Sequence, residues 1–308
     1  TDVYAGLCLY PLNVGPGHIP GLRALLSEMT AALTPGVQSC LVTEAGGALW
    51  RDAGLVQAVD SVLLQAFLEP GSAAPPGPLA PQDWFETLLN DAGAAVGPEK
   101  LRVALGSFAV MWAEDDAEPT GLAFAEAMRL LARNASTVGL DAGSLNTRAA
   151  YVAEDGRERE LWFLDAASLH NQLKALGDRR IAGVALWAVG LEDPGAWTLV
   201  TRGPDTQAAA ALASVSFPDY VGYEGTGPFR RIAQSGVTGQ RRFFLDPATG
   251  LVNGEIYDRL PRPVTVERYG HAPGKVVALT FDDGPDQSFT ADILDTLKAK
   301  DVTATFFV

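Results

Sequence analysis

Two adjacent carboxylates stand near the end of the chain. Asp282 and Asp283 lie between the apolar run 276–279 and the turn residues Gly284 and Pro285. Side chains alternate between the faces of a strand, so neighbouring aspartates converge on one site only where the strand gives way to a turn. One carboxylate could then hold a metal ion while the other accepts a proton. The pattern predicts a catalytic strand end; the alternative is that the pair only caps the helix that follows.

The hexapeptide 280–285, followed by a helix over 289–299 and a strand over 303–308, resembles the start of NodB-type polysaccharide deacetylases. The resemblance implies that Asp283 binds a divalent metal, zinc or cobalt, and that Asp282 is the general base for metal-activated water attacking an acetamide. In that family two histidines of a later motif complete the metal site. The histidines of this chain all precede the aspartates, at His18, His170 and His271. We therefore expect an N-deacetylase motif that does not bind the metal tightly by itself.

The composition of the chain is compatible with some kinds of function and argues against others. The 308 residues are 47% hydrophobic and 19% charged, as in ordinary soluble globular domains, and carry a net charge of −14. This charge argues against a nucleic-acid partner, which needs clustered Lys and Arg, while neutral and cationic glycans remain compatible. Cys8 and Cys40 are too few for a disulfide framework, and we interpret both as core residues rather than a bridge.

Neither a signal peptide nor an apolar stretch long enough to span a membrane is visible in the sequence, and the deacetylase pattern breaks off at Val308. We expect a piece of a longer protein, with any membrane contact made through segments outside this chain.

The first 200 residues alternate apolar runs with helical stretches, which is typical of βα units around a parallel sheet. The predicted strands cover 6–10, 37–43, 61–67, 101–108 and 181–187, and the predicted helices include 19–33, 84–92 and 121–135. Between the last two strands, 149–153 and 161–164 flank an Asp-Gly turn and predict an inserted β-hairpin.

Four segments, 60–64, 77–85, 162–166 and 183–187, look like the second half of a glycoside hydrolase family 18 barrel. On this resemblance the chain starts at the fourth strand of the barrel. That strand normally ends in a catalytic glutamate, but the equivalent stretch 5–12 contains no acid. A glycosidase needs an acid for the leaving group. The resemblance therefore implies a barrel whose catalytic acids are missing.

Two residues could still contact a sugar at this barrel. Trp187 matches the tryptophan that forms the floor of the family's sugar cleft, so we predict that it binds substrate; a core role is the alternative. The sixth strand of the family often carries an acid, and here Glu69 is the nearest replacement. An active glycosidase would depend on Glu69, and we do not favour it. Asp165 is interpreted as a loop or cap residue.

The sequence thus predicts an α/β protein with three parts: the C-terminal half of a TIM-type barrel with a hairpin insertion over 1–200, a small β-rich connector over 201–272, and the first β-α-β of a deacetylase barrel over 273–308. This order resembles bacterial barrel–deacetylase proteins that are often fused to a membrane-bound glycosyltransferase. It implies an extracytoplasmic, membrane-anchored deacetylase of the cell envelope acting on N-acetylated glycans such as chitin or peptidoglycan. The alternative is a non-catalytic, chitinase-like glycan-binding barrel.

Overall fold

The computed structural model describes residues 5–71, 74–113, 118–134, 136–177, 179–271 and 274–307. The predicted helix end at Ala135, the predicted boundary between 272 and 273, and Val308 of the last predicted strand lie outside these residues. The chain divides into two compact units. The first comprises Thr1–Gly222 and Gln234–Thr265, and the second comprises Tyr223–Ala233 and Val266–Val308.

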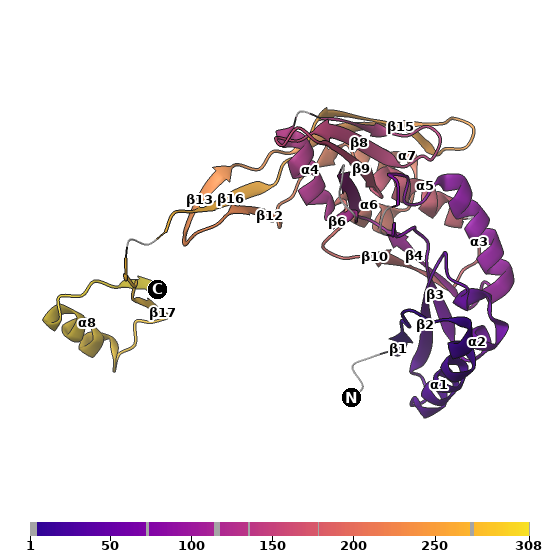
Figure 1. Ribbon diagram of the computed structural model, residues 1–308, viewed down its shortest axis with the longest axis horizontal. Coiled ribbons are helices and arrows are strands. Elements are labelled where there is room, and N and C mark those ends of the chain that lie inside the picture. Colours follow the sequence, from indigo (N-terminus) through magenta and orange to yellow (C-terminus); the bar gives the residue numbers. More distant parts are fainter. Residues whose placement is uncertain are drawn as a thin grey trace. The chain divides into compact units, whose positions relative to one another are not determined.

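The first unit contains a curled parallel sheet (Figure 1). Among the described residues it has five strands in the order β1-β2-β3-β4-β10. The strands are β1 (Gly6–Leu9), β2 (Gln38–Glu44), β3 (Ser61–Gln65), β4 (Leu101–Gly106) and β10 (Gly183–Trp187). Each overlaps its predicted range, and their ends differ from the prediction by at most two residues. The α/β class and the half-barrel are therefore confirmed.

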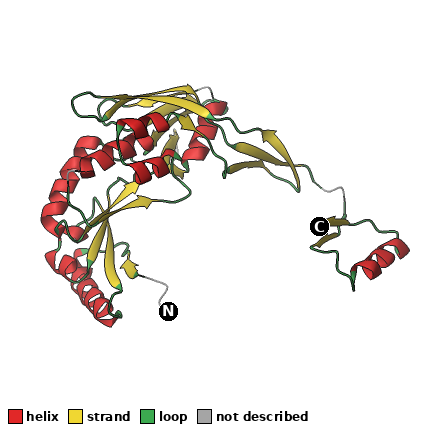
Figure 2. Cartoon of the chain, turned by 180° about the vertical axis from the view of Figure 1, so that it is seen from behind, coloured by secondary structure: helices red, strands yellow, loops and turns green. Residues whose placement is uncertain are grey.

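Helices flank this parallel sheet in the ribbon view of Figure 2. They are α1 (Ile19–Ala32), α2 (Ala53–Gln57), α3 (Gln82–Val96), α5 (Ala166–Gly177), α6 (Gly195–Arg202) and α7 (Thr206–Ala211), with 3₁₀ turns at Pro16–His18 and Leu49–Arg51. Pro20 sits in the first turn of α1, where its missing N–H costs no helical hydrogen bond. Leu26 of α1, Leu64 of β3 and Phe85 of α3 are fully buried in one core, so the helices and the sheet are held together by apolar burial.

Cys8 and Cys40 face each other in the pairing of β1 with β2, and both are free thiols. Cys40 is buried as predicted, and burial raises its pKa to about 12. Cys8 is exposed, so the prediction that it is a core residue is wrong. The reason is that β1 forms an edge of the sheet.

A second sheet is antiparallel and contains the predicted inserted hairpin. In the described part of the chain it has eight strands in the order β11-β14-β15-β7-β8-β9-β5-β6. These are β5 (Ala109–Ala113), β6 (Thr120–Leu122), β7 (Thr137–Leu140), β8 (Thr147–Val152), β9 (Glu158–Phe163), β11 (Ser214–Val215), β14 (Gly239–Leu245) and β15 (Val252–Arg259). The predicted hairpin is confirmed as β8 paired with β9. The amphipathic helix α4 (Phe124–Arg133) buries Phe124, Met128 and Leu131 in the core beneath this sheet.

Strands from the predicted connector belong to this same sheet. The strand β15 pairs with β7 at Ile256 and Gly139, and β14 pairs along most of β15. The side-chain amide of Asn171 on α5 makes two hydrogen bonds to the backbone of Val252, as a neighbouring strand would. Its Nδ2 donates to the Val252 carbonyl at 2.9 Å, and its Oδ1 accepts from the Val252 N–H at 2.7 Å. Residues Gln234–Thr265 therefore pack within the unit that contains the half-barrel. The division into three domains stays a prediction.

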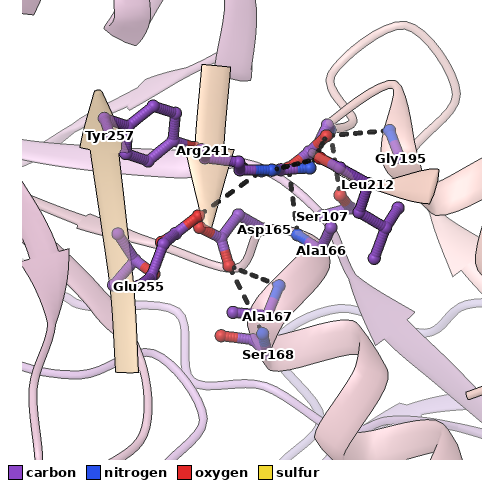
Figure 3. Close-up of polar contacts among 12 residues, drawn as sticks. Ser107, Asp165, Ala166, Ala167, Ser168, Gly195, Leu212, Arg241, Glu255 and Tyr257 are labelled. Carbon is purple, nitrogen blue, oxygen red and sulfur yellow. Dashed lines mark hydrogen bonds and ion pairs between the residues drawn. The ribbon is translucent and has the colours of Figure 1, made fainter. Parts of the chain in front are cut away.

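A buried ionic cluster anchors β14 and β15 (Figure 3). Arg241 of β14 donates from its two terminal nitrogens to Asp193, at 2.5 and 3.2 Å, and both side chains are fully buried. Arg241 also donates to the Leu212 carbonyl at 2.9 Å and to the Tyr257 hydroxyl at 3.1 Å, and it lies 3.5 Å from Glu255 Oε1. One guanidinium thus joins two strands to the loop that precedes α6.

Asp165 lies beside Glu255 in this cluster (Figure 3). Its Oδ1 accepts from the backbone N–H groups of Ala167 and Ser168 at 3.0 and 3.3 Å, which caps α5, so its predicted role as a cap is confirmed. Burial raises the pKa of both Asp165 and Glu255, because an ionised carboxylate loses its hydration there.

The second unit contains two small β structures. The strands β12 (Val221–Gly225), β16 (Val264–Tyr269) and β13 (Phe229–Gln234) form a sheet in that order. Next along the chain come β17 (Thr280–Asp282), α8 (Thr290–Ala299) and β18 (Thr305–Phe307), the predicted β-α-β. No helix among the described residues is long and apolar enough to cross a bilayer.

Candidate functional site

The aspartate motif lies where the sequence places it, at the end of a parallel strand pair. The strands β17 and β18 are parallel, with Phe281 opposite Phe306 and Asp282 opposite Phe307. The rings of Phe281 and Phe306 stack with their centroids 4.9 Å apart. Asp282 is the last residue of β17, and Asp283 follows with φ of +65°. This left-handed conformation breaks the strand alternation directly after Asp282. Both carboxylates consequently line one hollow, together with residues of α8 and Phe306.

Asp286 orders the turn just before α8, whose N-cap residue Phe289 has no side-chain capping bond. Its Oδ1 accepts from the backbone N–H groups of Ser288 and Phe289 at 2.8 and 3.0 Å. Asp282 and Asp283 are exposed, and neither side chain has a hydrogen bond or ion pair within the described part of the chain. The alternative in which the pair caps the helix is therefore wrong, because α8 has no side-chain capping bond and neither carboxylate accepts one of its N–H groups.

The described residues do not form a complete metal site. They include no group of three or more His, Cys, Asp or Glu side chains that could hold a metal ion. His170 is buried in α5, where burial lowers its pKa, and His18 accepts the Gly15 N–H at 3.1 Å through Nδ1. Asp283 can offer carboxylate oxygens, but a divalent ion needs further donors.

Trp187 ends β10 and is half-buried. One part of its ring packs toward Phe67, with centroids 6.5 Å apart, at the margin of an apolar cluster. The residue also lines an open hollow together with Glu69, Phe108 and Leu191. Trp187 contacts the core and also presents surface to a hollow at the carboxyl end of the sheet. The structure is therefore compatible with both hypotheses for this residue, sugar binding and a role in the core.

Sequence reasoning missed a polar group at this same edge. The Tyr10 hydroxyl, just after β1, lies 3.0 Å from Glu44 Oε1 and 3.1 Å from Gln65 Oε1. Glu44 and Gln65 are the paired last residues of β2 and β3. Burial and the hydrogen bond to Glu44 raise the pKa of Tyr10 to about 12. The signal was present, because carboxyl ends of parallel strands meet at one edge, but the predicted strand stopped one residue before Glu44.

The carboxylate of Glu69 is influenced by the charge of Glu44. Burial raises its pKa, and the charge of Glu44 raises it further. Tyr10 and Glu44 line one hollow, and Glu69 and Trp187 line another. Glu69 follows β3, which lies between β2 and β4 in the sheet.

Comparison with known proteins assigns different likenesses to the two ends of the chain. The polysaccharide deacetylase family model matches residues 269–308. The peptidoglycan-N-acetylglucosamine deacetylase PgdA of Listeria monocytogenes is 54% identical over 50 residues, which are 16% of this chain and 11% of that protein. The cortical fragment-lytic enzyme of Bacillus anthracis is 22% identical over 150 residues, 47% of this chain and 35% of that enzyme. The chain therefore spans about a third or less of these curated relatives.

Solved structures resemble the barrel part. The spore cortex-lytic enzyme SleL of Bacillus cereus superposes with a TM-score of 0.59 at 18% identity, covering 65% of this chain and 48% of SleL. A chitinase of Chromobacterium violaceum gives 0.58 at 23% identity, covering 65% and 66%. These likenesses show the fold. The chain thus combines a half-barrel that has the fold of these structures with a C-terminal segment that is similar to polysaccharide deacetylases, and both likenesses were predicted from the sequence.

Proposed function

We propose that this chain is part of a polysaccharide N-deacetylase that acts outside the cytoplasm on glycans containing N-acetylhexosamine. The observation that carries the proposal is the exposed Asp282–Asp283 pair at a strand end, inside the segment that matches the deacetylase family model. The PgdA likeness supports the glycan class, because that protein is a peptidoglycan deacetylase by name.

Asp282 acts as the general base in this proposal. Its carboxylate accepts the proton of a water molecule whose oxygen attacks the acetamide carbonyl carbon. The C–N bond then breaks, the amine leaves with a proton, and acetate is released. The exposed, unpaired state of Asp282 leaves its oxygens accessible to water and substrate.

Asp283 is proposed as a ligand of a divalent metal, zinc or cobalt. The described residues do not supply the further donors, so Asp283 by itself does not fit a metal centre. Asp283 would therefore supply one ligand position, and further donors would have to complete the site. A titration of the 308-residue chain with Zn²⁺ should show no tight site, and a submicromolar site abolished by Asp283→Asn would contradict this part of the proposal.

The test of catalysis uses the complete protein that carries this chain. Acetate release from N-acetylated chitooligosaccharides should depend on added Zn²⁺ or Co²⁺ and should fall by about 10²-fold or more in Asp282→Asn, the usual contribution of a positioned general base. Asp295→Asn makes the same charge change at an exposed position of α8 and should leave the rate unchanged. Full activity in Asp282→Asn would refute the assignment.

A second function is proposed for the half-barrel, namely non-catalytic binding of glycan. Two observations favour it: the stretch 5–12 carries no acid, and Trp187 lines a hollow at the carboxyl edge. A pyranose ring can place its apolar face on an exposed part of a tryptophan. Calorimetry with oligosaccharides should give a binding heat that disappears in Trp187→Ala, and equal heats in the two proteins would count against this role.

A further inference from the structure

The two cysteines of the chain are direct partners in the parallel sheet. Cys8 of β1 lies opposite Cys40 of β2 in the strand register, although the whole of α1 separates them in the sequence. Opposite residues of neighbouring strands point to the same face of a sheet. Both side chains are free thiols in this structure. The pairing of β1 with β2 therefore brings two reduced sulfur atoms side by side.

The spacing of paired strands is compatible with a disulfide. Neighbouring strands lie about 4.8 Å apart, and the Cα atoms of bridged cysteines are about 4.4–6.8 Å apart. The two thiols also interact in the folded protein. Burial is the first cause that raises the pKa of Cys40, and the hydrogen bond with Cys8 is the second. The two residues can therefore be joined without a change in strand register.

We infer that Cys8 and Cys40 form a reversible disulfide, here called the β1–β2 crosslink, when the protein meets a small-molecule disulfide such as oxidised glutathione. Cys8 is exposed and Cys40 is buried, so Cys8 reacts first. Its thiolate attacks one sulfur of the oxidant, the S–S bond of the oxidant breaks, and one glutathione leaves as a thiolate.

The second step closes the crosslink. Cys40 gives its proton to solvent and attacks Cys8 Sγ, which breaks the mixed disulfide and releases the second glutathione. In total the two cysteines lose two electrons and two protons, and oxidised glutathione takes them up to become two thiols. Because burial raises the pKa of Cys40, this second step should be slower than the first.

The β1–β2 crosslink would fasten a weakly held strand. In the described part of the chain, β1 lies at the edge of the parallel sheet. Its first three residues are exposed, and Leu9 is half-buried. A strand with so little burial opens more easily than the core. The crosslink ties this strand to β2, whose residues 39–43 are buried. It also closes a loop that contains α1, so the oxidised protein should keep β1 in place.

This inference goes beyond deacetylation and does not depend on it, because Asp282 and Asp283 belong to the other compact unit. A location outside the cytoplasm, as proposed above, would expose the cysteine pair to oxidising conditions.

The test treats the full protein with oxidised glutathione under native conditions, then alkylates the remaining thiols and maps the tryptic peptides by mass spectrometry. Trypsin cuts after Arg23 and Arg51, so Cys8 lies in the peptide that ends at Arg23 and Cys40 in peptide 24–51. We expect these two peptides to be recovered joined, from a protein that stays monomeric on a non-reducing gel. Dithiothreitol should separate them.

Matched variants identify the order of the two steps. Cys40→Ser should retain one glutathione on Cys8, because no second thiol is present to release it. Cys8→Ser should leave Cys40 without glutathione, because that thiol is buried. Hydrogen exchange then measures the effect on β1, whose amides should exchange about tenfold or more slowly in the oxidised than in the reduced protein.

Four results would overturn the inference. They are a stable glutathione on Cys8 beside a free Cys40, joined peptides only after unfolding in urea, joined peptides only in a covalent dimer, and equal exchange of β1 in the oxidised and reduced proteins. The assay needs neither glycan nor metal, so each of these results leaves the deacetylase proposal unchanged.

Discussion

Replacing Arg241 should destabilise the first unit strongly. Arg241→Met keeps most of the side-chain volume but removes the positive charge from a cluster in which Arg241 and Asp193 are both fully buried. Breaking a buried pair by removing one partner typically costs about 3–5 kcal/mol, because the other charge is left without compensation.

The size of this loss in unfolding free energy can also be worked out from protonation, because a buried carboxylate must take up a proton once the positive charge of Arg241 is gone. Asp193, Glu255 and Asp165 would remain buried without the guanidinium. Neutralising one ordinary aspartate, with a pKa near 3.9, costs about 4 kcal/mol at pH 7 but only about 1.5 kcal/mol at pH 5. The penalty of Arg241→Met should therefore shrink by roughly half or more between pH 7 and pH 5.

Urea unfolding followed by tryptophan fluorescence is the suitable assay. Every tryptophan of the chain, Trp50, Trp84, Trp112, Trp162, Trp187 and Trp197, belongs to the unit that contains Arg241, so the signal reports on that unit. Arg242→Met is the matched control. Arg242 is the neighbouring residue of β14 and makes a bidentate pair with Asp258 at 2.8 Å, but both side chains are about half exposed. Its replacement should not measurably shift the midpoint.

Two results would refute this reasoning. A loss below about 1 kcal/mol for Arg241→Met would mean that the cluster is hydrated or rearranges without cost. An equal loss at pH 5 and pH 7 would mean that packing, and not charge, accounts for the effect.

Two further substitutions test the same region. Glu255 has a raised pKa in the folded protein, so its contribution is present below the ordinary Glu value of about 4.3 and is lost as the pH rises through the raised value. Glu255→Gln should therefore gain stability relative to the parent protein between pH 5 and pH 9 in urea titrations, and a constant difference would contradict this sign. Asn171→Ala leaves the Val252 N–H and carbonyl without partners, at about 1–3 kcal/mol for each buried group, whereas Asn90→Ala at an exposed position of α3 should change little. Hydrogen exchange at Val252 should accelerate only in Asn171→Ala, and unchanged protection there would contradict the assigned role.

Local pattern was enough to predict the elements of the half-barrel and the aspartate motif. Strand and helix periods depend on residues a few positions apart, so 61–67 and 101–108 predict strands without any knowledge of their neighbours. The turn at Gly284 and Pro285 likewise predicts where β17 ends, because it follows Asp282 and Asp283 directly. The exposed position of Cys8 was missed, since an edge strand and a central strand have the same period.

Only the tertiary structure decided which distant residues meet. Arg241 and Asp193, for example, are 48 positions apart in the sequence. The turn residues of 201–272 predicted a separate connector, but in the antiparallel sheet β14 of this stretch pairs with β15, and β15 pairs with β7. Tyr10, Glu44 and Gln65 lie at or just beyond the carboxyl ends of three strands, and they meet because parallel pairing aligns those ends. Strand partners and register are chosen by the burial of whole faces rather than by any short segment, so the sequence determined the parts and the packing determined the polar groups they bring together.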